Sequence, residues 1–161
     1  MAASPLVLGS RSPRRAELLT AAGIPFVVRV ADIDETPRPD ESPREYVLRL
    51  AEEKGRAIPA DPNEFVLTAD TTVVLDGRIL GKPADIADAA RMLSELSGNR
   101  HHVITGVCLM RAGRRLAHAA ASTAVWFDPM TYDEIAEYAA SEEPIDKAGA
   151  YAIQGTASRW V

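Results

Sequence analysis

The sequence is poor in cysteine and aromatic residues, and it contains no long hydrophobic run. Cys108 is the single cysteine of the 161 residues, so the chain can form no internal disulfide. It lies in the apolar run ITGVCLM, which predicts a buried thiol. No apolar stretch approaches the ~20 residues of a membrane span, and Met1 to Pro5 lack the basic region of a signal peptide. These absences predict a cytoplasmic protein with no membrane partner.

Basic residues are fewer than acidic ones, 18 against 23, so the net charge is −5. This balance argues against generic nucleic-acid binding, so we expect no stable nucleic-acid partner. Apolar residues make up 47% of the chain and charged residues 25%, as in ordinary globular proteins. No repeat, linker or low-complexity segment divides the sequence. We therefore expect a single domain over residues 1–161.

The stretch from Leu6 to Leu19 predicts a strand, a turn and a helix. The apolar run 6–8 breaks at Gly9, and Ser12 followed by Pro13 is typical of a helix start. Unpaired backbone N–H groups would share this turn with the side chains of Ser10, Arg11, Ser12, Arg14 and Arg15. The combination predicts a phosphate site. An ordinary capped turn that binds no ligand stays the alternative.

An acidic loop follows a second predicted strand at residues 26–30. It contains Asp32, Asp34 and Glu35 and continues into the proline-rich piece TPRPDESP, which predicts no regular structure. Ser42, Pro43 and Glu45 then form a capping-box signature for the next helix. Lys54 lies on that helix, where a lysine is by default a solvated side chain.

The segment from Glu64 to Leu75 is the most strand-like in the chain, and Asp70 lies in its interior. A carboxylate among apolar neighbours is unfavourable unless it is paired, hydrogen-bonded or metal-bound, so Asp70 is the first catalytic candidate. The alternative is an aspartate that marks a turn or bulge between two short strands. Lys82 precedes Pro83, which fixes an extended backbone there. Its ammonium faces either a pocket or solvent.

The second half of the chain predicts a helix, a long hairpin and another helix. Apolar positions have helical spacing from Asp85 to Ser97, and strand-like runs cover His101 to Met110 and Leu116 to Phe127. His101 and His102 would face opposite sides of a strand, so no zinc site is expected. Thr131 caps the last helix. The tail, with Asp146, Lys147 and Gln154, predicts a loop and a short strand suited to lining a site. Together these elements predict one α/β domain with a mixed sheet flanked by helices.

Five stretches resemble, in order, the Maf-type nucleotide pyrophosphatases. They are GSRSPRRAELL, DETPRPDESPREYVLRLAEEKGRAI, TADTTVVLDGRILGKP, LSGNRHHVITGV and EPIDKAGAYAIQG. The resemblance spans almost the whole chain and implies the elongated, twisted mixed sheet that this family shares with the inosine triphosphate pyrophosphatase (Maf/Ham1) group. It implies hydrolysis of a nucleoside triphosphate between its α and β phosphates, with a divalent metal ion, Mg²⁺ or Mn²⁺.

The resemblance also implies roles for particular residues. Ser10, Ser12 and Arg15 would bind phosphate, and Glu35 with Asp70 would hold the metal. Asp70 would accept the proton of the attacking water, with Glu35 and Lys82 beside it in the catalytic set. Lys54, Lys82 and Lys147 would balance the triphosphate charge.

Base preference is implied by three further positions, Arg14, Thr71 and Gln154. They match the branch that prefers dTTP and UTP, and the Gln154 amide can pair with the O4 and N3–H edge of uracil or thymine. Modified pyrimidine nucleotides fit the same pocket, which suggests clearance of non-standard nucleotides. A sister branch that hydrolyses 7-methylguanosine triphosphate is the second reading. A nucleotide-binding regulator of septum formation and cell division is a third.

The chain departs from the family pattern at its C-terminal end. Members normally continue through a glycine-containing turn and a final helix, whereas this sequence stops at Val161. We expect the lack of that segment to leave a strand edge or an apolar surface uncovered. Homodimer formation is left open.

Overall fold

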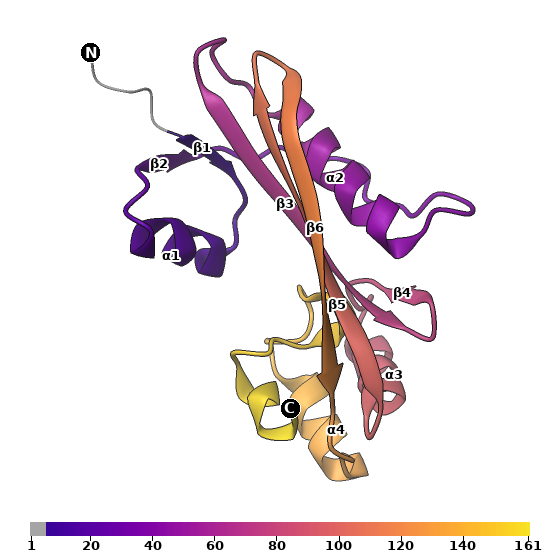
Figure 1. Cartoon of the computed structure of the whole chain (residues 1–161). Coiled ribbons are helices and arrows are strands. Elements are labelled where there is room, and N and C mark those ends of the chain that lie inside the picture. The colour runs from indigo at the N-terminus through magenta and orange to yellow at the C-terminus, as the bar shows by residue number, and fades with distance from the viewer. Residues whose placement is uncertain (1–5) are drawn as a thin grey trace. The chain divides into compact units, whose positions relative to one another are not determined.

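The computed structural model describes residues 6–161, which form a mixed α/β fold on a six-stranded sheet (Figure 1). The strands are β1 (Leu6–Gly9), β2 (Phe26–Val28), β3 (Phe65–Leu75), β4 (Arg78–Leu80), β5 (Arg100–Arg111) and β6 (Arg114–Trp126). The helices are α1 (Pro13–Ala21), α2 (Pro43–Ala57), α3 (Ile86–Leu96) and α4 (Tyr132–Ala140), then the 3₁₀ helices η1 (Ala148–Ala150) and η2 (Thr156–Trp160). The predicted α/β class is confirmed. The expectation about a signal peptide concerns residues 1–5, outside the described part.

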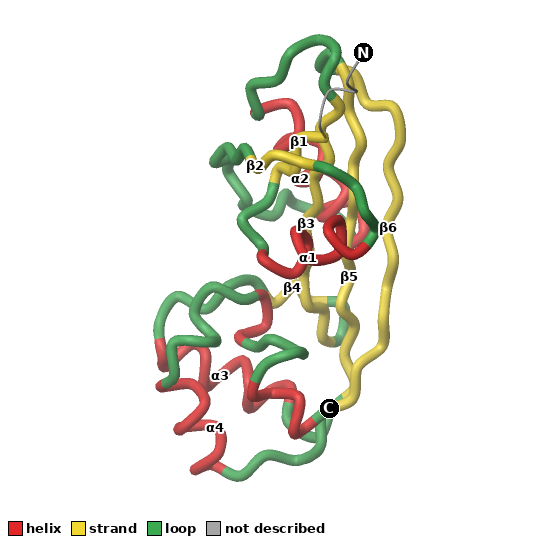
Figure 2. Tube along the Cα trace, turned by 90° about the vertical axis from the view of Figure 1, so that its left-hand side faces the viewer, coloured by secondary structure: helices red, strands yellow, loops and turns green. Residues whose placement is uncertain are grey.

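The strand order in the sheet is β2-β1-β3-β5-β6, with β4 paired to β3. β1 runs parallel to both of its neighbours, so that Val7 lies opposite Val27 on one side and Val66 on the other. β4 is antiparallel to β3 and follows the turn at Asp76 and Gly77, which both have positive φ. Figure 2 shows β5 and β6 side by side. β3 is an interior strand of the sheet, and most of its residues are buried, in agreement with its long apolar run.

The helices begin as the capping rules predict, with one exception. Ser42 and Thr131 form complete capping boxes with Glu45 and Glu134. Asp85 caps α3 by accepting a hydrogen bond from the Asp88 backbone N–H. Ser12 occupies the N-cap position of α1, but its side chain makes no capping hydrogen bond.

The chain divides into two compact units. The first comprises Met1–Asp70 and Thr105–Ala121, and the second Thr71–Ile104 and Ser122–Val161. In the first unit α2 packs closely on the sheet, since a Cβ added at Gly106 would lie 2.7 Å from the Val47 carbonyl. In the second unit α3, α4 and the tail surround an apolar cluster that includes Leu93, Phe127 and Trp160. The prediction of a single domain stays a prediction.

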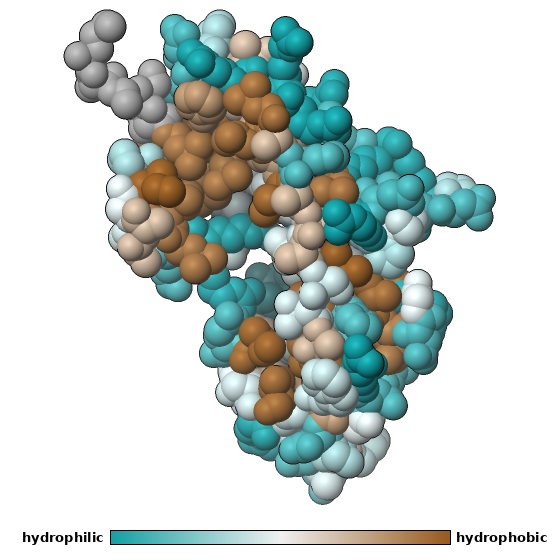
Figure 3. All heavy atoms as spheres, in the orientation of Figure 1, coloured by the Kyte–Doolittle hydropathy of each residue, from teal (hydrophilic) through white to brown (hydrophobic). Residues whose placement is uncertain are grey.

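Apolar side chains gather over β1, β2 and α1 on the face shown in Figure 3. Helix α1 buries none of its residues, and Leu18 is 70% exposed. Ile24, Val27 and Val28 are exposed nearby, on and before the strand that ends the sheet. None of the helices in residues 6–161 is long and apolar enough to cross a membrane.

Candidate functional site

Asp70 lies in the interior of β3 and is buried there. The strand runs without interruption from Phe65 to Leu75, so the alternative of a turn between two short strands is wrong. Burial raises the pKa of the Asp70 carboxyl, and the nearby charges of Lys54 and Arg15 offset only part of this rise. A buried carboxyl group with a raised pKa beside charged partners is a candidate for a general base.

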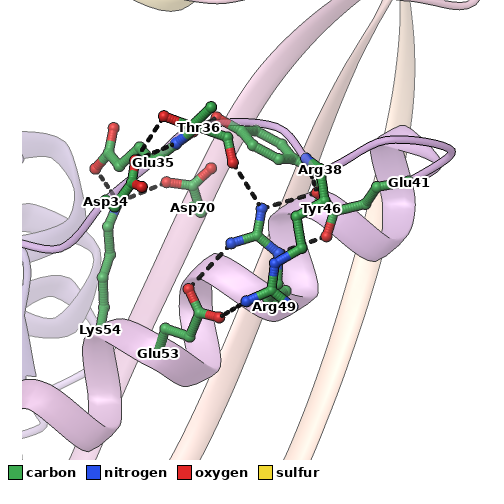
Figure 4. Close-up of polar contacts among 10 residues, drawn as sticks. All are labelled: Asp34, Glu35, Thr36, Arg38, Glu41, Tyr46, Arg49, Glu53, Lys54 and Asp70. Atoms are coloured by element: carbon green, nitrogen blue, oxygen red, sulfur yellow. Dashed lines mark hydrogen bonds and ion pairs between the residues drawn. The ribbon is translucent and has the colours of Figure 1, made fainter.

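Lys54 bridges Asp70 and Glu35 (Figure 4). Its Nζ lies 2.6 Å from an Asp70 carboxylate oxygen and 2.8 Å from one of Glu35. The lysine side chain is only 18% exposed, so the default expectation of a solvated lysine is wrong. Burial lowers the pKa of Lys54, but the two carboxylates outweigh it and the net direction is upward. Lys54 therefore carries its charge and holds two carboxylates together.

Glu35 comes from the loop between β2 and α2, which has no regular structure over the predicted TPRPDESP piece. Its side chain is 40% exposed, so Glu35 is accessible to solvent. Its backbone carbonyl accepts a hydrogen bond of 2.8 Å from the Tyr46 hydroxyl on α2. The loop therefore delivers the carboxylate and α2 holds the loop in place.

Ser10 and Arg15 form the second part of the candidate site. The Arg15 guanidinium donates to the Ser10 hydroxyl at 3.0 Å and to the Ala69 carbonyl at 2.8 Å, next to Asp70. The Ser10 hydroxyl also accepts from the Ser12 backbone N–H at 3.2 Å. Both acceptor positions of the Ser10 oxygen are thus used, which leaves its proton to donate to an anion.

The other members of the basic turn are placed differently. Arg11 is exposed and forms an ion pair with Asp32 at 3.3 Å. Arg14 is partly buried on α1, as is Ser12 at its start. The start of α1 has no acidic residue in its first turn, so no side-chain anion from that turn occupies the positive end of the helix.

The remaining predicted residues belong to the second unit. Thr71 follows Asp70 on β3 and is partly buried, and Gln154 is exposed in the tail. Lys147 forms an ion pair with Asp146. The pKa of Asp146 is lowered mainly by its hydrogen bond with Lys147 and to a smaller extent by the charge of Lys82. The Gly149 backbone N–H donates to the Gly81 carbonyl at 3.0 Å, which brings the tail beside the Lys82 loop. The structure therefore groups Lys82 with Lys147.

The tail corrects one expectation. Residues 142–161 form the 3₁₀ helices η1 and η2, and no strand follows β6 in the described chain. The cause is the backbone at Gly149 and Ala150, with φ of 66° and 60°, which turns the chain instead of extending it. Gly149 fits there because a Cβ would come within 2.8 Å of the Val73 side chain.

Two other expectations can be compared with the structure. Cys108 is fully buried, as its apolar run predicts, and burial raises the pKa of its thiol. His101 is buried in the second unit, and its Nε2 lies 2.7 Å from the Tyr151 hydroxyl. His102, its neighbour on β5, is partly exposed.

The carboxylates of Glu35 and Asp70 fit a cation that is shared with a bound phosphate group. No group of three or more His, Cys, Asp or Glu side chains within residues 6–161 could hold a metal ion. Magnesium is commonly held by one or two carboxylates together with substrate phosphates and water. Two carboxylates beside a candidate phosphate site match that pattern of oxygen donors.

Sequence reasoning missed two residues of this region, Tyr46 and Arg49. The Tyr46 hydroxyl donates to the Glu35 carbonyl at 2.8 Å. Arg49 donates to the Thr36 carbonyl at 3.1 Å. Helical spacing places both side chains on one face of α2, but no local signal shows that this face contacts the acidic loop.

Comparisons with known proteins identify the family. The sequence model of the Maf-like protein family matches residues 5–161. A dTTP/UTP pyrophosphatase of Anaeromyxobacter dehalogenans (strain 2CP-C) is 53% identical over 159 residues, covering 97% of this chain and 80% of that protein. One of Xanthomonas axonopodis pv. citri (strain 306) is 49% identical over 161 residues, covering 97% and 85%.

A solved structure supports the fold. The HAM1 protein from Coxiella burnetii superposes with a TM-score of 0.52 at 17% identity, covering 76% of this chain and 72% of that one. This likeness concerns the fold, and the predicted similarity to the Maf/Ham1 fold is confirmed. From the match over residues 5–161 and the two relatives, the chain belongs to the Maf-like protein family.

Proposed function

We propose that this chain is a metal-dependent nucleoside triphosphate pyrophosphatase that hydrolyses dTTP and UTP to the monophosphate and pyrophosphate. The observation that carries the proposal is the Lys54 bridge between Asp70 and Glu35, beside the anion-binding groups of Ser10 and Arg15. Relatives about half identical in sequence carry the name dTTP/UTP pyrophosphatase, which supports this choice of substrate. The proposed location is the cytoplasm, where nucleoside triphosphates are made and used.

The phosphate groups would bind at the start of α1. The Ser10 hydroxyl would donate a hydrogen bond to the phosphate, and Arg15 supplies a fixed positive charge. The Arg15 guanidinium is anchored to the Ala69 carbonyl, so a phosphate bound there lies beside β3 and Asp70. This arrangement orients the substrate with little loss of side-chain freedom on binding.

Asp70 would act as the base. It takes a proton from water, the hydroxyl adds to one phosphoryl group of the α–β anhydride, and the bridging oxygen leaves with the other. Glu35 and Asp70 would hold the divalent cation. When bound, that cation withdraws negative charge from the phosphate oxygens and so lowers their repulsion of the incoming hydroxyl. Lys54 forms ion pairs with both carboxylates, and its charge lowers the pKa of Asp70 against the effect of burial.

The roles of the other predicted residues stay predictions from the resemblance. They are the charge-balancing role of Lys82 and Lys147, the phosphate contact of Ser12, and the base preference assigned to Arg14, Thr71 and Gln154. Homodimer formation and the lack of a nucleic-acid partner are also predictions, and the proposal uses none of them.

A pyrophosphate-release screen of purified protein tests the proposal. The substrates are the standard triphosphates together with 7-methylguanosine and pseudouridine triphosphates, each with Mg²⁺, Mn²⁺ or a chelator. Turnover of dTTP, UTP and pseudouridine triphosphate that the chelator abolishes is the expected result. Preference for the methylated purine would overturn the choice of base while keeping the reaction. Nucleotide binding without turnover would favour a regulatory role instead.

A further inference from the structure

The loop that carries Glu35 has no secondary structure of its own to hold it. Between β2 and α2, residues 29–42 form neither helix nor strand, yet the Glu35 carboxylate reaches Lys54 at 2.8 Å. Loops are the more mobile parts of most folds, and a displacement of about 1 Å at a reacting group can reduce the rate about 10²-fold. Some contact must therefore fix the backbone at Glu35.

Two successive backbone carbonyls of the loop are bound by side chains of α2. The Tyr46 hydroxyl donates to the Glu35 carbonyl at 2.8 Å, and an Arg49 Nη donates to the Thr36 carbonyl at 3.1 Å. Tyr46 and Arg49 are three residues apart on the helix, so their side chains lie on the same face. Helix α2 also carries Lys54, and it thus provides both the anchors of the loop and the partner of the Glu35 carboxylate (Figure 4).

Arg49 fixes the far side of the loop as well. Its Nε and Nη2 bind the two carboxylate oxygens of Glu41 at 2.5 and 2.8 Å, and its Nη1 binds Glu53 at 3.0 Å. The side chains of Arg49 and Glu41 are only 13% and 8% exposed. A second arginine, Arg38, binds the other oxygen of Glu53 at 2.8 Å. These contacts tie the loop to α2 on both sides of residues 37–40.

The anchors keep their charge states near neutral pH. Burial is the main cause that raises the pKa of Tyr46 to about 12, so its hydroxyl remains a donor. The hydrogen bonds of Arg49 lower the pKa of Glu41, so this carboxylate stays charged. Both groups therefore keep, at physiological pH, the protonation state that these contacts require.

We infer that Tyr46 and Arg49 are positioning residues, which fix the backbone at Glu35 and Thr36 on α2 so that the Glu35 carboxylate meets Lys54. They act through Glu35 and need no contact with the substrate. The inference rests on the proposed function, because it gives these two residues a part in that reaction.

A double-mutant cycle between Tyr46→Phe and Glu35→Gln tests the inference. Tyr46→Phe removes a single hydroxyl. We expect it to lower kcat for UTP about tenfold and to raise KM no more than about twofold, because Tyr46 positions Glu35 and does not bind the substrate. In the Glu35→Gln background the same substitution should change kcat less than about twofold, because the carboxylate that Tyr46 positions is no longer present. Equal effects in both backgrounds would overturn the inference.

Arg56→Met is the matched control, since Arg56 lies on the same helix and its side chain is 61% exposed in an ion pair with Glu52. We expect it to leave kcat within about twofold of the parent, as for other exposed ion pairs. Arg49→Met removes the larger anchor, but it leaves Glu41 buried without its partner and can unfold the protein. Tyr46→Phe is therefore the deciding variant.

Hydrogen exchange gives a reading that does not depend on activity. We expect Tyr46→Phe to speed amide exchange in residues 33–41 at least about threefold while α3 exchanges as in the parent, because the loop loses one anchor. Unchanged exchange in 33–41 would overturn the anchoring. If the parent protein hydrolyses no triphosphate, the proposed function fails, and the exchange result alone decides whether Tyr46 holds the loop.

Discussion

The two compact units differ in what they bury. In the first unit charged side chains are withdrawn from water as pairs, namely Lys54 with Asp70 and Arg49 with Glu41. Glu64 is buried as well and pairs with Arg29, whose side chain is 40% exposed. In the second unit the described interior is largely aliphatic and aromatic. Its rings are in contact, with the centroids of Phe127 and Tyr151 4.8 Å apart, and its buried ionisable groups include His101 and Tyr151.

This difference indicates which part of the chain is built for chemistry. Burying apolar surface contributes about 25 cal/mol per Å² to folding, whereas a buried ion pair is often no more stabilising than a hydrophobic pair of equal volume. Charges kept inside the first unit are therefore better explained by a task than by stability. The interior of the second unit consists mainly of packed aliphatic and aromatic side chains around the buried His101.

Asp70→Asn should have the largest effect. We expect kcat to fall about 10³-fold, because the amide cannot accept a proton. The midpoint of thermal unfolding should not fall, since burial raises the pKa of Asp70 and its charge is unfavourable in the folded state. Steady-state kinetics and a melting curve on the same sample measure both. Activity near that of the parent would remove Asp70 from its proposed role.

Lys54→Met should change the pH dependence of the reaction. Lys54 lowers the pKa of Asp70, so its removal raises that pKa and a higher pH is needed to deprotonate the base. We expect kcat/KM at pH 7 to fall about 10²-fold, with the acidic limb of the pH profile displaced to higher pH. Profiles of the two proteins from pH 5 to 9 provide the test. An acidic limb at the same pH in both would contradict the bridge.

In the second unit, His101 should make the free energy of unfolding depend on pH. Burial lowers the pKa of His101 to about 4, against an ordinary value of 6.5. Between these two pH values the His101 side chain is protonated in the unfolded chain and neutral in the folded chain. Stability from this group is complete above pH 6.5 and is lost as the pH falls toward 4, by about 3 kcal/mol. Urea unfolding at several pH values measures the loss. His101→Gln should lose less over the same range, and identical losses would refute the assignment.

Gly106→Ala should have the smallest effect of these substitutions, and the effect is on stability. Together with a control in the second unit, it compares how tightly the two units are packed. A Cβ at Gly106 would lie 2.7 Å from the Val47 backbone on α2, which cannot move without displacing the helix. We expect a loss of about 1–3 kcal/mol in the free energy of unfolding. Gly81→Ala in the second unit is the control, because a Cβ there meets nothing within 4 Å and should change stability by less than about 0.5 kcal/mol. Equal effects of the two substitutions would show that α2 tolerates displacement.

Local patterns predicted most of the elements and singled out Asp70 as a catalytic candidate. The capping boxes at Ser42 and Thr131 depend on residues three apart, and the strand around Asp70 on a run of apolar neighbours. The Lys54 bridge could not be predicted locally, because it joins residues 16 apart in the chain across a helix and a strand. The anchors Tyr46 and Arg49 were missed for the same reason. The tail was wrongly expected to extend because the positive φ of Ala150 has no sequence signal.

In the proposed reaction, the bridged carboxylates serve hydrolysis between the α and β phosphates. The most direct measurement is the identity of the products from UTP and Mg²⁺, followed by ³¹P NMR for the parent and for Asp70→Asn. We predict UMP and pyrophosphate in equal amounts with the parent, and neither with the variant over the same time. UDP and inorganic phosphate from the parent, or equal product formation by both proteins, would contradict the account.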